Sequence, residues 1–350
     1  MLLMMGLEEQ ISEQMGLFDF TDIDRALSGS GVSFPGLMER AVRGELDLTP
    51  WTLIGAAFNS FLGETASLFS VMGTLTVIVL LGAVLRVLSS SFTRKSVSEA
   101  GFFITYLISV ALIMSSFFLC IDIMRDVTGL LGGIMEAALP LMVAAAVMAG
   151  NGVKAYAVNP VILFALTFIT EFIKNVAAPA IVSAALLQTA SCMTERDMLL
   201  KLTEFIKKAI SWALRIICVF FTAVLSLQSL TAPIISSIAV KSAKYAVNAV
   251  PVVGSAMSGA VDTVLIAAGT LKNGMVAAAV IALVTACAVP LIKTASFLFV
   301  YKLTAAILQP AGDERIVNLI DLTGGLAGLA LSACTVTAVM FIFMAVILLA

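Results

Sequence analysis

Five ionisable residues inside long apolar stretches are the places where this sequence could carry chemistry. They are Glu171, Lys174, Lys241, Lys244 and Asp262. A charge at membrane depth is unfavourable unless it is paired or lines a polar pathway. Glu171 and Lys174 lie three residues apart, so on a helix they either pair with each other or line a polar surface together. Asn175 and Pro179 predict a break in the same helix.

The other three residues of this set leave two interpretations open. Lys241 and Lys244 are three residues apart on an amphipathic segment, which either anchors to lipid phosphates or lines a cavity. Asp262 follows the small residues of segment 254–259, whose spacing favours tight helix packing. Asp262 either belongs to that packing or faces a water-filled cavity.

A further polar cluster separates two apolar stretches near the C-terminus. It comprises Gln309, Asp313, Glu314 and Arg315, with Pro310 and Gly312 between them. Proline and glycine are typical of a turn, and the three charged side chains can pair locally. The cluster is either a helix cap that locks the turn or a docking point for a partner subunit.

Missing residue types exclude the common enzyme classes. The chain has no histidine, which excludes HExxH metalloproteases, Ser-His-Asp triads and zinc deaminase sites on this chain alone. No glycine is followed by lysine, so there is no Walker A motif and nucleotide hydrolysis would need a partner protein. The five cysteines are too widely separated for a metal or disulfide framework. We therefore expect a non-enzymatic protein with no catalytic, cofactor-binding or metal-binding residue.

The composition indicates that these residues lie in a lipid bilayer. Of 350 residues, 61% are hydrophobic and only 12% are charged, against about 25% charged in an average soluble domain. A soluble fold could not bury that much apolar surface, so the excess must face lipid.

Charge-free stretches locate the expected membrane spans, because about 20 apolar residues in a helix cross a hydrocarbon core of roughly 30 Å. Six clear stretches cover residues 66–85, 100–121, 175–194, 216–240, 273–292 and 322–350. Shorter ones cover residues 137–153, 155–170, 245–261 and, interrupted by Lys302, 294–308. We predict an all-α polytopic membrane helix bundle with about 8–10 spans.

Two sequence features indicate how these helices pack. Pro140, Pro160, Pro179 and Pro290 lie within apolar stretches and predict kinked or broken helices. Small residues recur as Gly129 with Gly133 and as Gly324 with Gly328. Such faces are typical of a densely packed multi-helix body or of a homo-oligomer.

Charge divides the chain into two parts. Residues 1–50 hold nine acidic residues and three arginines, and the remainder holds 13 acidic and 17 basic residues. We predict a short helical acidic arm over residues 1–50 and a polytopic membrane domain over 51–350. Neither part has the basic stripe with interleaved aromatics that a nucleic-acid partner requires.

Basic loops set the expected orientation. Arg86, Arg94 and Lys95 follow the first span, and four basic residues lie between 196 and 208. The positive-inside rule places these loops in the cytoplasm and the arm outside. Asp122, Arg125 and Asp126 are expected in a loop after the second span. Residues 1–7 lack a basic n-region, so we expect no complete signal peptide there.

Three stretches resemble the stage III sporulation protein AE family of endospore-forming bacteria. The first runs from Lys241-Ser-Ala-Lys244 through Val250-Pro-Val-Val-Gly254 and Asp262 to Asn273. The second is Gln309-Pro-Ala-Gly-Asp313-Glu314-Arg315, and the third is the region around Ile173-Lys174-Asn175. The likeness extends loosely over residues 63–141.

This resemblance implies a multi-pass protein of the mother-cell side, in the outer forespore membrane. It would belong to the channel-like complex that links mother cell and forespore, with other membrane and intermembrane-space proteins and a cytoplasmic ATPase as partners. The alternative function is a secondary transporter or permease that uses Asp262, Glu171, Lys174 and Lys241.

Overall fold

The computed structural model describes five stretches of the chain. They are residues 62–84 without 64, 67 and 71; 95–146; 164–194 without 166; 199–223; and 281–349 without 282, 283 and 285, together with Gly36. Every regular element in these stretches is a helix, and they contain no strand. The predicted all-α class is therefore confirmed. The expected boundary between residues 50 and 51 falls outside the described residues.

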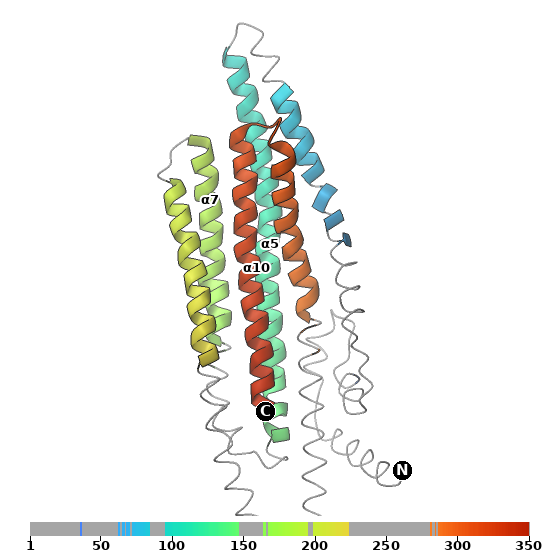
Figure 1. Ribbon diagram of the computed structural model, residues 1–350, viewed down its shortest axis with the longest axis vertical. Coiled ribbons are helices and arrows are strands. Elements are labelled where there is room, and N and C mark those ends of the chain that lie inside the picture. The colour runs from blue at the N-terminus through green and yellow to red at the C-terminus, as the bar shows by residue number, and fades with distance from the viewer. Residues whose placement is uncertain are drawn as a thin grey trace, which may run out of the picture.

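The described residues form six helices, which run alternately up and down the bundle (Figure 1). In chain order they are 62–84, α5 (Lys95–Ala146), a helix that contains η2 (Ile173–Ala177) and α7 (Ala178–Thr194), 199–223, Ala286–Leu308, and α10 (Glu314–Leu349). α5 and α10 lie side by side in the middle, and α10 packs against both α5 and α7. The helix over 199–223 is the outermost on one side.

Four of the helices in the described residues are long and apolar enough to cross a membrane. These spans are Phe103–Ala137, Thr167–Met193, Ala286–Leu308 and Glu314–Phe343. Their outward faces carry exposed large apolar side chains such as Ile104, Phe168 and Phe299, as expected for surfaces in contact with lipid. The predicted total of about 8–10 spans includes stretches outside the described residues.

α5 corrects two predictions. The second span was expected to end at residue 121, but α5 continues as one helix of 52 residues and includes Pro140. Asp122 and Arg125 are not in a loop, because they form an ion pair of 3.7 Å along this helix. Charged side chains leave the backbone hydrogen bonds of a helix intact. They therefore limit the length of α5 that can contact lipid, but they do not end the helix. At about 1.5 Å per residue, α5 extends well beyond a roughly 30 Å hydrocarbon core.

The two C-terminal helices show the same effect. The predicted stretches 273–292 and 294–308 were divided at Lys293, but the helix Ala286–Leu308 runs through both Lys293 and Lys302. α10 begins at Glu314 rather than at residue 322, so Asp321 lies inside it. Lys302 and Asp321 form an ion pair between these two helices.

Two buried tyrosines fix α5 against its neighbours. The Tyr106 hydroxyl donates a hydrogen bond of 2.7 Å to the carbonyl of Thr189 on α7. The Tyr301 hydroxyl lies 2.5 Å from the Ser116 hydroxyl and donates a bond of 3.2 Å to the carbonyl of Ile113. Both tyrosines are almost completely buried, so these bonds join three helices inside the core.

Candidate functional site

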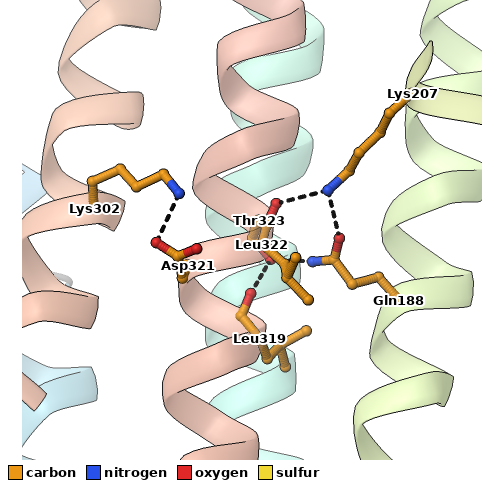
Figure 2. A network of polar contacts seen from close by, with 7 residues as sticks. All are labelled: Gln188, Lys207, Lys302, Leu319, Asp321, Leu322 and Thr323. Carbon is orange, nitrogen blue, oxygen red and sulfur yellow. Dashed lines mark hydrogen bonds and ion pairs between the residues drawn. The ribbon is translucent and has the colours of Figure 1, made fainter. Parts of the chain in front are cut away.

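A network of polar side chains crosses the bundle between α7, the 199–223 helix and α10 (Figure 2). The Lys207 ammonium donates to Gln188 Oε1 at 3.2 Å and to the carbonyl of Leu322 at 3.5 Å. Gln188 Nε2 donates to the Thr323 hydroxyl at 3.4 Å. Thr323 in turn donates to the carbonyl of Leu319 at 2.8 Å. Three helices are therefore joined through one lysine and one glutamine.

An ion pair continues this network on the other side of α10. The Lys302 ammonium lies 2.7 Å from Asp321 Oδ1, which joins the Ala286–Leu308 helix to α10 (Figure 2). We call Gln188, Lys207, Lys302, Asp321 and Thr323 the polar layer. It connects four helices at one level of the bundle.

Glycine allows the helices to approach at the polar layer. A methyl group on Gly324 would lie 3.1 Å from Cβ of Tyr301 and 3.5 Å from the Lys302 stem. On Gly325 it would lie 3.7 Å from the Lys207 ammonium, and on Gly328 3.6 Å from Leu298. The expected small-residue face of Gly324 and Gly328 thus packs against the Ala286–Leu308 helix.

Lys207 has an environment that is unusual for a lysine. Its hydrogen-bond acceptors are an amide and a backbone carbonyl rather than a carboxylate. Burial lowers the pKa of Lys207 from the ordinary value of a lysine, and the nearby Lys302 ammonium lowers this pKa further. Burial therefore makes the charged form of Lys207 less favourable, and its two hydrogen bonds offset this cost.

The polar layer was not predicted from the sequence. The sequence predicts a cytoplasmic loop for Lys207, Lys302 interrupts the predicted stretch 294–308, and Asp321 precedes the predicted span 322–350. The signal in the sequence that could have indicated the polar layer was Gln188, a polar side chain in the apolar stretch 175–194. The structure buries this side chain fully. Buried amides require hydrogen-bond partners.

The structure separates the predicted pair of Glu171 and Lys174. Asn175 donates from Nδ2 to Glu171 Oε2. Lys174 points across to α5, where a methyl group on Gly129 would lie 3.0 Å from its ammonium nitrogen. The expected break is a single π-helical turn at η2, after which the helix continues through Pro179. π-Helical turns are rare and occur frequently at functional sites.

On α5 the predicted small-residue pair was Gly129 with Gly133, but in the structure Gly132 takes the place of Gly133. Gly129 faces Lys174, and Gly132 faces Thr170, whose hydroxyl would lie 3.3 Å from an added methyl group. Gly133 has nothing within 4 Å of such a group. Gly129 and Gly132 are therefore the residues that allow the helix with Lys174 to approach α5.

The polar turn between the last two helices has the geometry of a helix cap. The Asp313 carboxylate accepts a 3.0 Å hydrogen bond from the backbone N–H of Arg315, at the start of α10. A methyl group on Gly312 would lie 2.9 Å from the Leu308 carbonyl oxygen and from Val317. Gln309 and Glu314 are exposed, which keeps a docking role available to them.

Three of the candidate residues lie outside the described part of the chain. They are Lys241, Lys244 and Asp262. All five cysteines are free, and Cys120, Cys287 and Cys334 are buried. Among the residues that the structure describes, no group of three or more His, Cys, Asp or Glu side chains could hold a metal ion.

Comparison with known proteins identifies the family. Residues 32–350 match the family described as stage III sporulation protein AE. The chain belongs to this family. A protein of Bacillus subtilis (strain 168) named stage III sporulation protein AE is 28% identical over 307 residues, which cover 87% of this chain and 77% of that protein. No solved structure matches the chain.

The family assignment confirms the resemblance of the three sequence stretches. It supports a role in sporulation, and the four apolar helices in the described residues are those of a membrane protein. The stage III sporulation protein AE match includes every described helix, so the polar layer lies within the family region.

Proposed function

We propose that this chain is a non-enzymatic integral membrane component of the channel-like complex that links mother cell and forespore during endospore development. The observation that carries the proposal is the family match over residues 32–350, because it covers the whole described bundle. In this role the chain contributes spanning helices and assembly surfaces rather than reaction chemistry.

The contacts of the charged residues support a scaffold. Lys302 and Asp321 pair with each other, and Lys207 donates to Gln188 and to the carbonyl of Leu322 on neighbouring helices. The polar layer therefore uses its donors to hold helices together. A rigid bundle of this kind suits a subunit that must keep its shape while other proteins assemble around it.

The proposed partners follow from the family resemblance. They are other membrane and intermembrane-space proteins of the complex and a cytoplasmic ATPase. The chain is placed in the outer forespore membrane on the mother-cell side, with the acidic arm over residues 1–50 between the two membranes.

Gene deletion tests the proposal in an endospore-forming bacterium that carries this gene. We expect deletion to abolish mature spores and the intact gene to restore them. The tagged protein should also copurify with the ATPase from mother-cell membranes. A normal spore yield, or a purified complex that contains the ATPase but not this chain, would contradict the proposal.

The π-helical turn beside Glu171 and Lys174 favours a second candidate, a secondary transporter. This turn places a carboxylate and an ammonium within a membrane-spanning helix. Purified protein in liposomes would then accumulate a solute against its gradient without any other protein, and Glu171→Gln would abolish this uptake. A failure of the wild-type protein to concentrate any of a panel of amino acids and ions would remove this candidate.

A further inference from the structure

The helix over residues 199–223 is the outermost on one side of the bundle (Figure 1). It carries a stripe of exposed apolar side chains. The stripe consists of Leu202, Phe205, Ala209, Trp212, Ile216 and Val219, which are all exposed. Their spacing alternates between three and four residues, as at the a and d positions of a coiled coil. Phe205 and Trp212 are each 67% exposed, and Val219 is 69% exposed. We call these six residues the outer seam.

The opposite face of the same helix, and not the outer seam, packs against the bundle. Thr203, Ile210, Leu214 and Phe221 are buried, and Lys207 lies on the same face and reaches the polar layer. The spacings of this set are four, three, four and seven residues, which keeps it on one face of the helix. The helix therefore has two seams, of which one is occupied by the bundle and one has no occupant in the described structure.

Three cations line one edge of the outer seam. Lys201, Lys208 and Arg215 are spaced by seven residues, so they follow the g positions of the same heptads. All three are exposed, and none forms an ion pair with a described residue. In coiled coils such positions select a partner through charges of opposite sign.

Lipid does not fit this surface. Lys201 and Arg215 are 14 residues apart, or about 21 Å at 1.5 Å per residue. Lys207 of this helix meets Gln188 inside the Thr167–Met193 span, so a lipid-facing outer seam would place Lys208 and Arg215 at the depth of the roughly 30 Å hydrocarbon core. Water does not fit it either, because the large apolar side chains of the outer seam would remain exposed.

A second copy of this helix does not satisfy the cations. In an antiparallel pair the g positions face each other, which brings Lys208 close to Arg215 of the copy. In a parallel pair the g positions face the e positions, which are the apolar residues Ile206, Ala213 and Phe220. Neither arrangement supplies a carboxylate.

We propose that the outer seam docks an α-helix of another protein, with an apolar a/d stripe flanked by Asp or Glu at seven-residue spacing. Its apolar stripe covers Phe205 and Trp212, and its carboxylates pair with Lys201, Lys208 and Arg215. The inference rests on the proposed function only in that a multi-protein complex would supply such a helix.

Tryptophan fluorescence tests the seam directly. The chain has two tryptophans, so the full-length Trp51→Phe variant reports on Trp212 alone. It is placed in phosphatidylcholine nanodiscs with either of two synthetic 21-residue peptides, which share leucine at a and d but carry Glu or Lys at e and g. We expect the Glu peptide to shield Trp212 from acrylamide and to bind about tenfold more tightly than the Lys peptide, from three exposed ion pairs.

Charge reversal provides the decisive comparison. The triple variant K201E/K208E/R215E should reverse the preference, so that the Lys peptide binds more tightly. The control Glu204→Lys changes an exposed charge of the same helix outside the outer seam, and it should keep the preference for the Glu peptide.

Four results would overturn the proposal. These are equal binding of both peptides, no shielding of Trp212 by either, strong quenching of Trp212 by brominated acyl chains, and disulfide cross-linking between two copies of Phe205→Cys. The first two reject an acidic helix, the third assigns the seam to lipid, and the fourth assigns it to a second copy. None of these measurements uses sporulation, so a normal spore yield after gene deletion would reject the proposed function alone.

Discussion

Lys207 and Lys208 are neighbours in sequence with opposite environments. Lys207 turns inward to Gln188 of α7 and to the carbonyl of Leu322 on α10. Lys208 is exposed and has no ion pair with a described residue. The two positions therefore allow the contribution of the buried hydrogen bonds to be measured against an exposed control.

We expect Lys207→Met to lower the free energy of unfolding by about 1–3 kcal/mol, because the buried Gln188 carbonyl oxygen loses its donor. Lys208→Met should change this free energy by less than about 0.5 kcal/mol. Circular dichroism of the purified variants in detergent, followed during thermal unfolding, measures both effects. Equal stabilities of the two variants would show that the polar layer contributes little.

At this scale the sequence predicted the kinds of residue better than their partners. Asp313 was expected to act as a cap or a docking point, and its hydrogen bond to the Arg315 N–H supports the cap. Glu171 and Lys174 were expected either to pair or to line a polar surface together, but Asn175 donates to the Glu171 carboxylate and Lys174 extends to α5. Spacing along one helix shows which residues are able to meet. It does not show that Lys174 can instead extend over a glycine of another helix.

At the scale of whole elements, one glycine determines how the 62–84 helix crosses α5. A methyl group on Gly82 would lie 2.5 Å from Cγ2 of Thr105, a contact that real side chains do not form. Gly73 lies on the same helix, and nothing is within 4 Å of a methyl group there. The crossing therefore depends on Gly82 and not on the glycine content of the helix.

Gly82→Ala should destabilise the bundle by about 1–3 kcal/mol through overpacking. Gly73→Ala should be neutral or stabilise it by up to about 1 kcal/mol, since alanine favours a helix interior over glycine. Thermal unfolding in detergent measures both variants. Thr105→Ala should partly restore the stability of Gly82→Ala, and an absence of any rescue would mean that the two helices do not meet at this pair.

The sequence predicted the existence of the helices but not all of their ends. The first expected span agrees well with the 62–84 helix, and the third agrees at its end. Its expected start at residue 175 was wrong, because the span Thr167–Met193 runs through Glu171 and Lys174. α5 was divided at Asp122, and the Ala286–Leu308 helix at Lys293, because hydropathy treats every charge as the end of a span. A charge paired along its own helix, as Asp122 is with Arg125, does not interrupt that helix.

Across the whole molecule, two of the connections between described helices lie at the same end (Figure 1). The end of α7, the start of the 199–223 helix and the turn between Leu308 and Glu314 lie together there (Figure 1). The basic residues between 196 and 208, most of which begin the 199–223 helix, predict that this end lies on the cytoplasmic side. The orientation hypothesis therefore extends to the polar turn with Gln309 and Asp313.

Cysteine labelling in intact cells tests this orientation. In a background with Cys192 and Cys218 replaced by alanine, the remaining cysteines are buried. A membrane-impermeant maleimide should label Ser30→Cys from outside and should label Gln309→Cys only after permeabilisation. The same accessibility at both positions, or the reverse pattern, would contradict the positive-inside assignment.

The two tyrosine bonds of α5 restrict how the bundle can change shape. Tyr106 holds α5 to α7, and Tyr301 holds it to the Ala286–Leu308 helix. Both bonds end on backbone carbonyls, so a slide of one helix turn along either contact would carry a buried hydroxyl away from its acceptor. Rotation or tilting about these points preserves the bonds. A ratchet-like shift of α5 past either neighbour therefore requires breaking a buried hydrogen bond, at a cost of about 1–3 kcal/mol, whereas hinging does not.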